Sequence, residues 1–372
     1  MKKVLVTGAN GFIGRNFCCE LSRFPDRYAL LRADVETSAE QLREYLGACD
    51  VVVHFAGVNR PKDDSEFRTG NAGFTGDVVS ELAELGNAVP VVMTSSVQAA
   101  FDNPYGRSKR EGEEVLFSYG RVQKVPVYVF RLPNVFGKWC RPNYNSAVAT
   151  FCYNIARGLP IQVNEPERIM TLVYIDDVVA AVRAAVDGEL LPRADGYCYV
   201  PTAYTAPLQY IADKIAEFRA VRDTLVMPAL TGLDKALYST YLSYLPTDAF
   251  AYAPVKHADA RGLFAELFKT AELGQFSVST TAPGITRGNH WHHTKTEKFI
   301  VVSGEASTRL RKIDETGVVE YRTSGETPTV IDIPPGYTHS ITNTSADREL
   351  VTLIWANEPF DPARPDTYPA EV

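Results

Sequence analysis

The 372-residue sequence has little that would tie it to a membrane or a polyanion. No run reaches the roughly 18 apolar residues that a bilayer-spanning helix needs. The short apolar run after Met1 is broken at Gly8, so it predicts a buried strand and not an export signal. Positive charge is in deficit, with 38 Lys and Arg against 45 Asp and Glu and a formal charge of −7. This balance disfavours nucleic acids and anionic membranes as partners.

Cysteine is also scarce, and its placement excludes two structural roles. Six cysteines occur, all before residue 200, and none forms a CxxC pair. This spacing indicates neither a disulfide framework nor a thiolate zinc site. We therefore expect reduced thiols in a cytoplasmic protein. The positions are Cys18, Cys19, Cys49, Cys140, Cys152 and Cys198.

The length and the pattern of the chain predict two domains. Single cores usually stop growing at about 250–300 residues, and the chain is longer than that. Alternating strand and helix signals fill the first part, and short strand-like runs separated by Gly, Pro, Asn and Asp fill the rest. We place the boundary at residue 245, which gives an α/β domain over 1–245 and an all-β domain over 246–372.

The segment "KVLVTGANGFIG", residues 3–14, predicts a nucleotide site. An apolar strand runs into three glycines and then into residues with helical spacing. This order brings backbone N–H groups and a helix N-terminus against a pyrophosphate. The strands and helices that follow predict a doubly wound parallel sheet. The expected cofactor contacts are Gly8, Asn10, Gly11, Phe12, Ile13 and Gly14.

Arg32 bears on which dinucleotide is bound. An enzyme that accepts the 2′-phosphate of NADPH often carries an Arg after its second strand, where one that prefers NADH carries an acidic residue. The second predicted strand ends in Arg32, with Asp34 two residues on. We therefore favour NADPH, with a merely solvated Arg32 as the alternative.

The segment "TSSVQAAFDNPYGRSK" carries a possible acid/base pair. Tyr105 and Lys109 are four residues apart, so they share one face if this segment is helical. An adjacent ammonium favours the phenolate and lowers the pKa of a tyrosine, which could then exchange a proton with a substrate oxygen during hydride transfer.

With these motifs, residues 1 to about 245 resemble the extended short-chain dehydrogenase/reductase family. "HFAG", "RLPNVFG" and "MTLVYIDDVVAAV" add to the likeness. The resemblance implies that Ser96, Tyr105 and Lys109 are the catalytic residues. Ser96 and Tyr105 are only nine residues apart, closer than is common in the family, so Ser95 stays an alternative to Ser96.

The same resemblance points to substrate contacts. The "RxPNVFG" stretch lies beside the sugar nucleotide in this family, which makes Arg131 and Asn134 candidates. The alternative is that both belong to a structural turn after a buried strand.

A histidine cluster marks the second half. Three of the six histidines fall in "RGNHWHHTK", residues 287–295. On a strand His290 and His292 point to one face and His293 to the other. With Glu297 and the distant His339 the first pair could form a site of three imidazoles and one carboxylate, a donor set that suits Zn, Fe, Mn or Ni.

This half resembles the cupin family, whose fold is an antiparallel β-barrel. One of its motifs covers Gly284, His290, His292, Glu297 and Gly304. The other covers Pro334, Gly336, His339 and Asn343, although Pro328 stands where that motif begins with glycine. The resemblance implies a divalent metal, with zinc favoured. Some sugar-nucleotide cupins instead use an HxH pair as acid/base groups without metal, and that alternative stays open.

Two further residues are predicted substrate contacts in this half. "DARGLFAE", residues 259–266, resembles the opening of the deoxysugar 3,5-epimerase cupins. The likeness assigns Arg261 and Glu266 to the sugar pocket, and an ordinary charged strand edge is the alternative. His293 is expected to be a surface histidine, with a catalytic base as the alternative.

The combination of both halves resembles bifunctional enzymes of bacterial capsule and O-antigen synthesis. That resemblance implies a UDP-4-keto-6-deoxy-N-acetylhexosamine substrate, epimerised at C3 and reduced at C4 with NADPH, a zinc ion and a homodimer. Two alternatives stay open. The cupin could be a structural or dimerising module of a simple reductase, or the chain could be a non-enzymatic sensor of nucleotide sugars.

Overall fold

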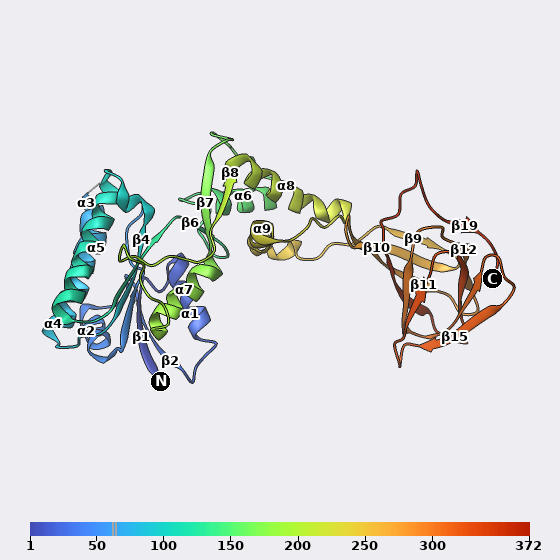
Figure 1. The fold of residues 1–372 in the computed structure, drawn as a ribbon, viewed down its shortest axis with the longest axis horizontal. Coiled ribbons are helices and arrows are strands. Elements are labelled where there is room, and N and C mark those ends of the chain that lie inside the picture. Colours follow the sequence, from blue (N-terminus) through green and yellow to red (C-terminus); the bar gives the residue numbers. More distant parts are fainter. Residues whose placement is uncertain (62, 64) are drawn as a thin grey trace. The chain divides into compact units, whose positions relative to one another are not determined.

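The structure is a computed structural model that describes residues 1–61, 63 and 65–372. The chain forms two compact units (Figure 1). The first consists of Met1–Ile215 and Lys235–Leu245, the second of Ala216–Asp234 and Pro246–Val372. The single domain boundary at residue 245 stays a prediction. The two compact units differ from it in one segment, Ala216–Asp234, which belongs to the second unit. Within the described residues no helix is both long and apolar enough to cross a bilayer.

A parallel sheet with the strand order β2-β1-β3-β4-β5 forms the centre of the first unit. Its strands are β1 (Lys2–Thr7), β2 (Tyr28–Ala33), β3 (Val51–His54), β4 (Val91–Ser96) and β5 (Val127–Leu132). Their valine-rich runs are buried because helices cover both faces. The predicted doubly wound sheet is therefore confirmed.

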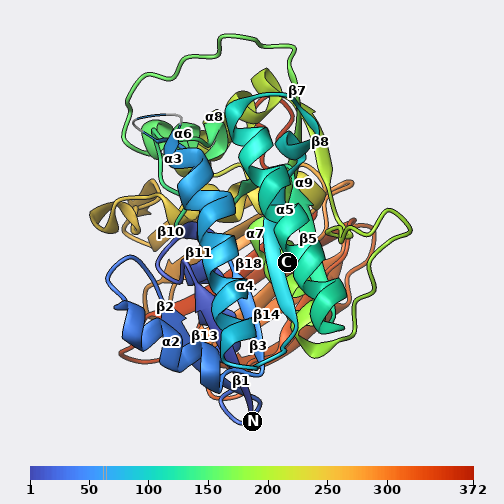
Figure 2. The same ribbon diagram turned by 90° about the vertical axis from the view of Figure 1, so that its left-hand side faces the viewer.

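The helices divide between the two faces of this sheet. One face packs against α1 (Phe12–Leu21) and α7 (Ile175–Asp187). The other packs against α2 (Ala39–Ala48), α4 (Phe74–Glu84) and α5 (Pro104–Gln123), of which α4 and α5 lie nearest the viewer in Figure 2. The strand order reverses between β1 and β3, and a crevice at the carboxyl ends of such strands is where open α/β sheets bind ligands.

The rest of the first unit adds a small second sheet and further helices. The sheet has the order β6-β7-β8, with β6 (Asn134–Phe136) parallel to β7 (Ile169–Tyr174) and β8 (Tyr204–Pro207) antiparallel to β7. The first unit also contains α3 (Ser65–Phe67) and α6 (Ala147–Ala156), whereas α8 (Leu208–Thr224) and α9 (Gly232–Ser243) each have residues in both units.

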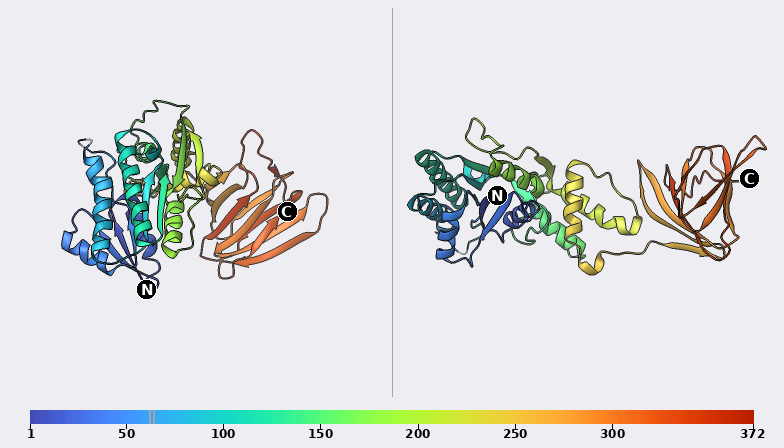
Figure 3. Two further views of the ribbon diagram at one scale, coloured as in Figure 1. Left: turned by 60° about the vertical axis from the view of Figure 1, so that its left-hand side comes forward. Right: turned by 90° about the horizontal axis from the view of Figure 1, so that it is seen from below.

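The second unit is a pair of antiparallel sheets, as Figure 3 shows in its orange and red strands. One sheet has the order β16-β13-β18-β11-β10-β9 and the other β15-β14-β17-β12-β19. The first is built from β9 (Lys256–Asp259), β10 (Gly262–Thr270), β11 (Gly274–Thr281), β13 (Glu297–Ser303), β16 (Val330–Ile333) and β18 (Leu350–Ala356). The second is built from β12 (Thr286–Trp291), β14 (Glu305–Lys312), β15 (Val318–Ser324), β17 (Tyr337–Asn343) and β19 (Tyr368–Pro369).

Alternation along these strands explains the packing of the two sheets. In β13 Phe299 and Val301 are buried, and they join Leu310 of β14 and Ile341 of β17 in one apolar cluster. Side chains of alternating residues point to opposite faces of a strand, so the intervening residues face outward. The predicted antiparallel barrel of the cupin type is confirmed.

Candidate functional site

The turn between β1 and α1 is built for close approach of a ligand to backbone. Gly8 has φ of +66°, and a Cβ at Gly14 would lie 2.1 Å from the Gly8 carbonyl oxygen. Glycine is therefore required at both positions. The turn and the start of α1 line a cavity of about 1200 Å³ at the switch between β1 and β3. All six glycine-loop residues predicted to contact the cofactor line this cavity: Gly8, Asn10, Gly11, Phe12, Ile13 and Gly14.

Arg32 takes a different place from the one predicted. It is not among the residues that line the cavity, and its Nη2 donates to the Ser22 hydroxyl at 3.4 Å. Asp34 does line the cavity, where its carboxylate accepts the Asn10 N–H at 2.6 Å and the Val35 N–H at 2.9 Å. The acidic residue thus braces the glycine turn through the backbone N–H of Asn10.

The predicted catalytic residues meet in this same cavity. Ser96 ends β4, and Tyr105 and Lys109 lie one turn apart at the start of α5. Asn103 caps this helix by accepting the Gly106 N–H at 2.8 Å. The tyrosine hydroxyl donates to the Asn59 side-chain oxygen at 3.0 Å, a partner that the sequence pattern did not reveal.

Ser95 and Ser96 have different surroundings. The Ser95 hydroxyl donates to the buried carboxylate of Glu113 at 2.5 Å. The Ser96 hydroxyl accepts a local backbone N–H, from Gln98 at 3.2 Å, and is half-buried at the strand end, where its hydrogen bond to Tyr105 works to lower the pKa of that tyrosine. Ser96 is thus the serine that contacts Tyr105, whereas Ser95 is held by Glu113.

Burial governs the protonation of the Tyr105–Lys109 pair. It lowers the pKa of Lys109 to about 8, an effect that the nearby Glu113 opposes. Burial also raises the pKa of Tyr105, opposed by the Ser96 hydroxyl. The expected lowering by Lys109 is thus not seen in the protein alone, since Lys109 Nζ lies 6.0 Å from the centre of the tyrosine ring.

Arg131 and Asn134, both predicted substrate contacts, are placed differently. Arg131 donates through Nε and Nη2 to the carboxylate of Glu113, at 3.0 and 2.5 Å, and stacks on Tyr197. It does not line the cavity, whereas Asn134 does and donates to the Thr171 carbonyl oxygen at 3.1 Å.

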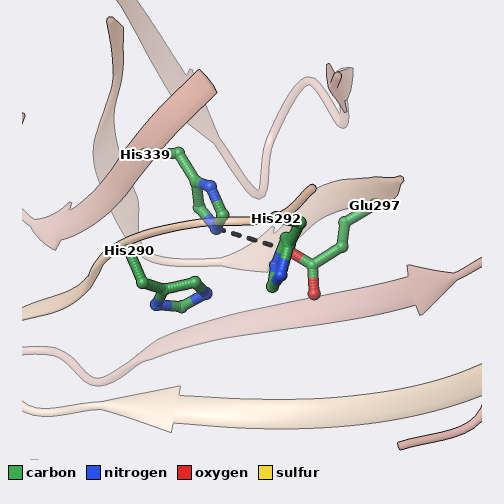
Figure 4. Close-up of side chains that lie close together, drawn as sticks. All are labelled: His290, His292, Glu297 and His339. Atoms are coloured by element: carbon green, nitrogen blue, oxygen red, sulfur yellow. Dashed lines mark ion pairs between the residues drawn. The ribbon is translucent and has the colours of Figure 1, made fainter. Parts of the chain in front are cut away.

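The four predicted metal ligands converge inside the second unit (Figure 4). His290 of β12 pairs in register with His339 of β17, and Glu297 opens β13. One ligand atom from each of the four residues lies within 4.8 Å of every other. The Nε2 atoms of His292 and His339 lie 3.2 and 3.3 Å from Glu297 Oε2.

The chemistry of these atoms fits a cation. His292 Nδ1 lies 2.6 Å from the carbonyl oxygen of Asp366, which can only accept, so the ring proton sits on Nδ1 and Nε2 presents a lone pair. In the described part of the chain, the Nε2 atoms of His292 and His339 and Oε2 of Glu297 are all buried without a hydrogen-bond partner. Three buried lone pairs that face one another are costly unless a cation lies between them.

The charge states agree with this donor set. Burial lowers the pKa of His290 to about 4, helped by the neighbouring His339 and His292, so its imidazole is neutral at pH 7. Neutral imidazoles and a carboxylate are the forms that bind divalent metals.

Comparison with known proteins places the chain in a family. The profile of the NAD dependent epimerase/dehydratase family matches residues 4–190, and that of the polysaccharide biosynthesis C-terminal domain matches residues 257–368. A UDP-2-acetamido-2,6-beta-L-arabino-hexul-4-ose reductase of Pseudomonas aeruginosa is 47% identical, covering 100% of this chain and 99% of the relative. The crystal structure of the capsular polysaccharide assembling protein CapF from Staphylococcus aureus matches with a TM-score of 0.93 at 44% identity, covering 99% of this chain and 100% of CapF. The chain belongs to the CapF-like proteins of the NAD dependent epimerase/dehydratase family.

A second relative covers only part of this CapF-like chain. The spore coat polysaccharide biosynthesis protein SpsL of Bacillus subtilis is 28% identical over 126 residues, which is 30% of this chain and 80% of SpsL.

A cavity of about 440 Å³ adjoins the histidine cluster of the CapF-like chain. Glu266 lines it, as predicted from the sequence, and pairs with Lys269 at 3.1 Å. Arg261 does not line it, because its guanidinium is held by Asp259 at 2.6 Å. His293 is exposed, also outside the lining.

Arg287 is a cavity residue that sequence reasoning missed. Among the residues that the structure describes, its Nε and Nη2 are buried without a hydrogen-bond partner, and Asp259 Oδ1 lies 3.9 Å from Nη2. Unpaired buried guanidinium donors suit an anionic or carbonyl group of a ligand. Its place three residues before His290, at the start of "RGNHWHHTK", was the signal that the sequence offered.

Proposed function

We propose that this CapF-like chain is a bifunctional enzyme of UDP-sugar metabolism. The second unit would epimerise C3 of UDP-2-acetamido-2,6-dideoxy-β-L-arabino-4-hexulose, and the first would then reduce the C4 ketone with NADPH. The product would be UDP-2-acetamido-2,6-dideoxy-L-talose, for N-acetyl-L-fucosamine synthesis. The observation that carries the proposal is the meeting of Ser96, Tyr105 and Lys109 in one cavity with the glycine turn, in a chain 47% identical to a named hexulose reductase.

The chemistry of the substrate sets the order of the two steps. A proton leaves C3 readily only while C4 is a ketone, because the resulting carbanion delocalises onto that oxygen. Reduction at C4 removes this acidifying group and keeps the new configuration. Epimerisation therefore comes first.

In the second unit His290, His292, Glu297 and His339 would hold a divalent metal, for which we propose zinc. Such a metal supplies Lewis-acid stabilisation of negative charge on the ketone oxygen. The unpaired donors of Arg287 and the carboxylate of Glu266, which line the same cavity, would orient the sugar nucleotide. A cavity of about 440 Å³ accommodates a hexulose with part of its diphosphate.

In the first unit the glycine turn would bind NADPH, which supplies the hydride. The Tyr105 hydroxyl would then give its proton to the oxygen at C4, and the Lys109 ammonium one turn away would stabilise the phenolate that remains. Ser96, which contacts Tyr105, would hold that oxygen through its hydroxyl. Asn134, which lines the same cavity, would contact the substrate.

Cofactor choice, assembly and location complete the proposal. We favour NADPH because Arg32 ends the second strand, although Asp34 lines the cavity. A UDP-activated sugar and NADPH are cytoplasmic metabolites, so we place the enzyme in the cytoplasm. We propose a homodimer from the family resemblance, which sedimentation of the purified protein would test.

The experiment follows the proton at C3 by NMR, with the UDP-4-keto sugar in deuterated water and no NADPH. Deuterium should enter at C3 and stop entering after chelation. Tyr105→Phe should keep this exchange and lose NADPH oxidation by at least about 100-fold. Tyr199→Phe, which removes a phenol that donates to Asp195 outside both cavities, is the matched control.

Each contrary outcome has a definite meaning. Loss of exchange in Tyr105→Phe would overturn the division of labour between the units. Exchange that survives chelation would make His290 and His292 acid/base groups without metal. No exchange in the wild type would leave the second unit as a structural module of a reductase.

A further inference from the structure

The segment Pro365–Ala370, here called the strap, lies against the histidine cluster although it is far from it in sequence. Its strand β19 pairs with β12, so that Pro369 lies opposite His290 and Tyr368 opposite Trp291. Figure 1 shows β19 and β12 side by side in the second unit. The proposed function uses no residue of the strap.

Asp366 of the strap contacts a proposed metal ligand directly. Its carbonyl oxygen accepts the His292 Nδ1 proton at 2.6 Å. This bond fixes the tautomer of His292 and the rotation of its ring, so that Nε2 points at Glu297 Oε2. Histidine ligands of metals are generally oriented by such a bond from the other ring nitrogen.

The side chain of the same residue locks that carbonyl group in place. The Asp366 carboxylate accepts the backbone N–H groups of His293, Thr294 and Lys295 at 2.9, 2.9 and 2.8 Å, and the Thr294 hydroxyl at 3.1 Å. These bonds hold the pKa of Asp366 below its usual range, although burial opposes them. One residue thus clamps the loop after His292 and the ring of His292 together.

The backbone conformation at Asp366 explains why this residue type is suitable. Its φ is +40°, in the left-handed region that most L-residues avoid. Asp and Asn enter that region at lower cost than other side chains because they hydrogen-bond locally. Alanine at this position would lose the clamp and disfavour the conformation.

The strap also reaches the neighbours of two other ligands. The Ala370 N–H donates to the Asn289 carbonyl oxygen at 3.0 Å, next to His290. The buried Thr338 hydroxyl donates to the Ala370 carbonyl oxygen at 2.6 Å, next to His339. Lys295 Nζ donates to the Pro365 carbonyl oxygen at 3.1 Å.

We propose that Asp366 is a positioning residue that sets the tautomer and orientation of His292 for metal binding. The proposal rests on the proposed metal site of the second unit.

The test compares Asp366→Ala with Asp361→Ala in the full chain. Asp361 is a matched control because its carboxylate accepts only local groups, the Ala363 N–H at 2.9 Å and Arg364 Nε at 3.5 Å. Zinc affinity is measured by competition with a chelating dye. Asp366→Ala should bind zinc about 10- to 100-fold more weakly than wild type, and Asp361→Ala within twofold of it. Asp366→Asn, which tolerates the left-handed backbone and keeps one acceptor oxygen, should fall between them.

A second measurement needs no metal. In the metal-free protein with ¹⁵N-labelled histidine, the His292 signals should report a proton on Nδ1 in the wild type and in Asp361→Ala, and mixed tautomers in Asp366→Ala. Unchanged tautomer and unchanged zinc affinity in Asp366→Ala would overturn the proposal. A wild type that fixes the tautomer but binds no zinc would instead count against the metal in the proposed function and leave the positioning role supported.

Discussion

The bond between Arg131 and Glu113 gives a prediction that separates structure from substrate binding. Arg131 was predicted to contact the sugar nucleotide, but its guanidinium forms a hydrogen-bonded ion pair with Glu113, which is 1% exposed. Removing one partner of a buried ion pair costs about 3–5 kcal/mol, because the other charge stays buried. The Arg131 side chain is 22% exposed, so we expect the lower end, about 3 kcal/mol, for Arg131→Met.

Urea denaturation of the full chain measures this cost. With a slope of about 3 kcal/mol per M, the midpoint of the transition should fall by about 1 M. Glu113→Gln should cost a similar amount. The double variant should cost clearly less than the sum of the two, because no charge is then left unpaired. An unchanged midpoint in Arg131→Met, with a KM for the UDP-sugar raised at least tenfold, would refute this reasoning and restore Arg131 as a substrate contact.

Two further predictions concern the glycine turn and the sheet beneath it. Gly14→Ala should weaken NADPH binding by at least about tenfold in a fluorescence titration, since the added Cβ would lie 2.1 Å from the Gly8 carbonyl oxygen. Gly76→Ala, with nothing within 4 Å of its Cβ, should bind normally, and equal affinities would contradict the reasoning. Burial and the Lys109 ammonium lower the pKa of His54 to about 3 in the folded chain. Below pH 6.5 the unfolded chain therefore binds a proton at His54 that the folded chain does not bind, and the free energy of unfolding falls. Between pH 6.5 and 5 the wild type should lose about 2 kcal/mol more than His54→Gln in urea denaturation, and parallel losses would contradict this.

Local sequence carries much of both sites. The glycine turn follows from spacing, because only glycine permits the positive φ at Gly8 and the close approach at Gly14. Tyr105 and Lys109 share a face because one helical turn separates them. In the cupin half, the two-residue spacing of an extended chain predicts His290 and His292 on one side, with His290 on β12 and His292 directly after it. The family motifs name Glu297 and His339 as their partners.

Long-range partners follow a different logic. Arg131 and Glu113 are 18 residues apart on β5 and α5, and the sheet order brings them together. Arg32 likewise donates to Ser22, ten residues before it, and not to the cavity. Arg261 is the local exception, because it pairs with Asp259 only two residues before it. A charged side chain has several polar groups within reach, and packing of distant elements selects among them. No periodicity in the sequence records that choice.

The strap shows most clearly which contacts the sequence could not predict. His292 and Asp366 are 74 residues apart, and the bond that orients the ring uses a backbone carbonyl group that every residue possesses. Residue type and spacing in the sequence can therefore predict a metal ligand, because histidines are few and their spacing on a strand is regular. The group that aims the ligand depends on strand pairing across the folded barrel, which forms only when the whole chain is in place.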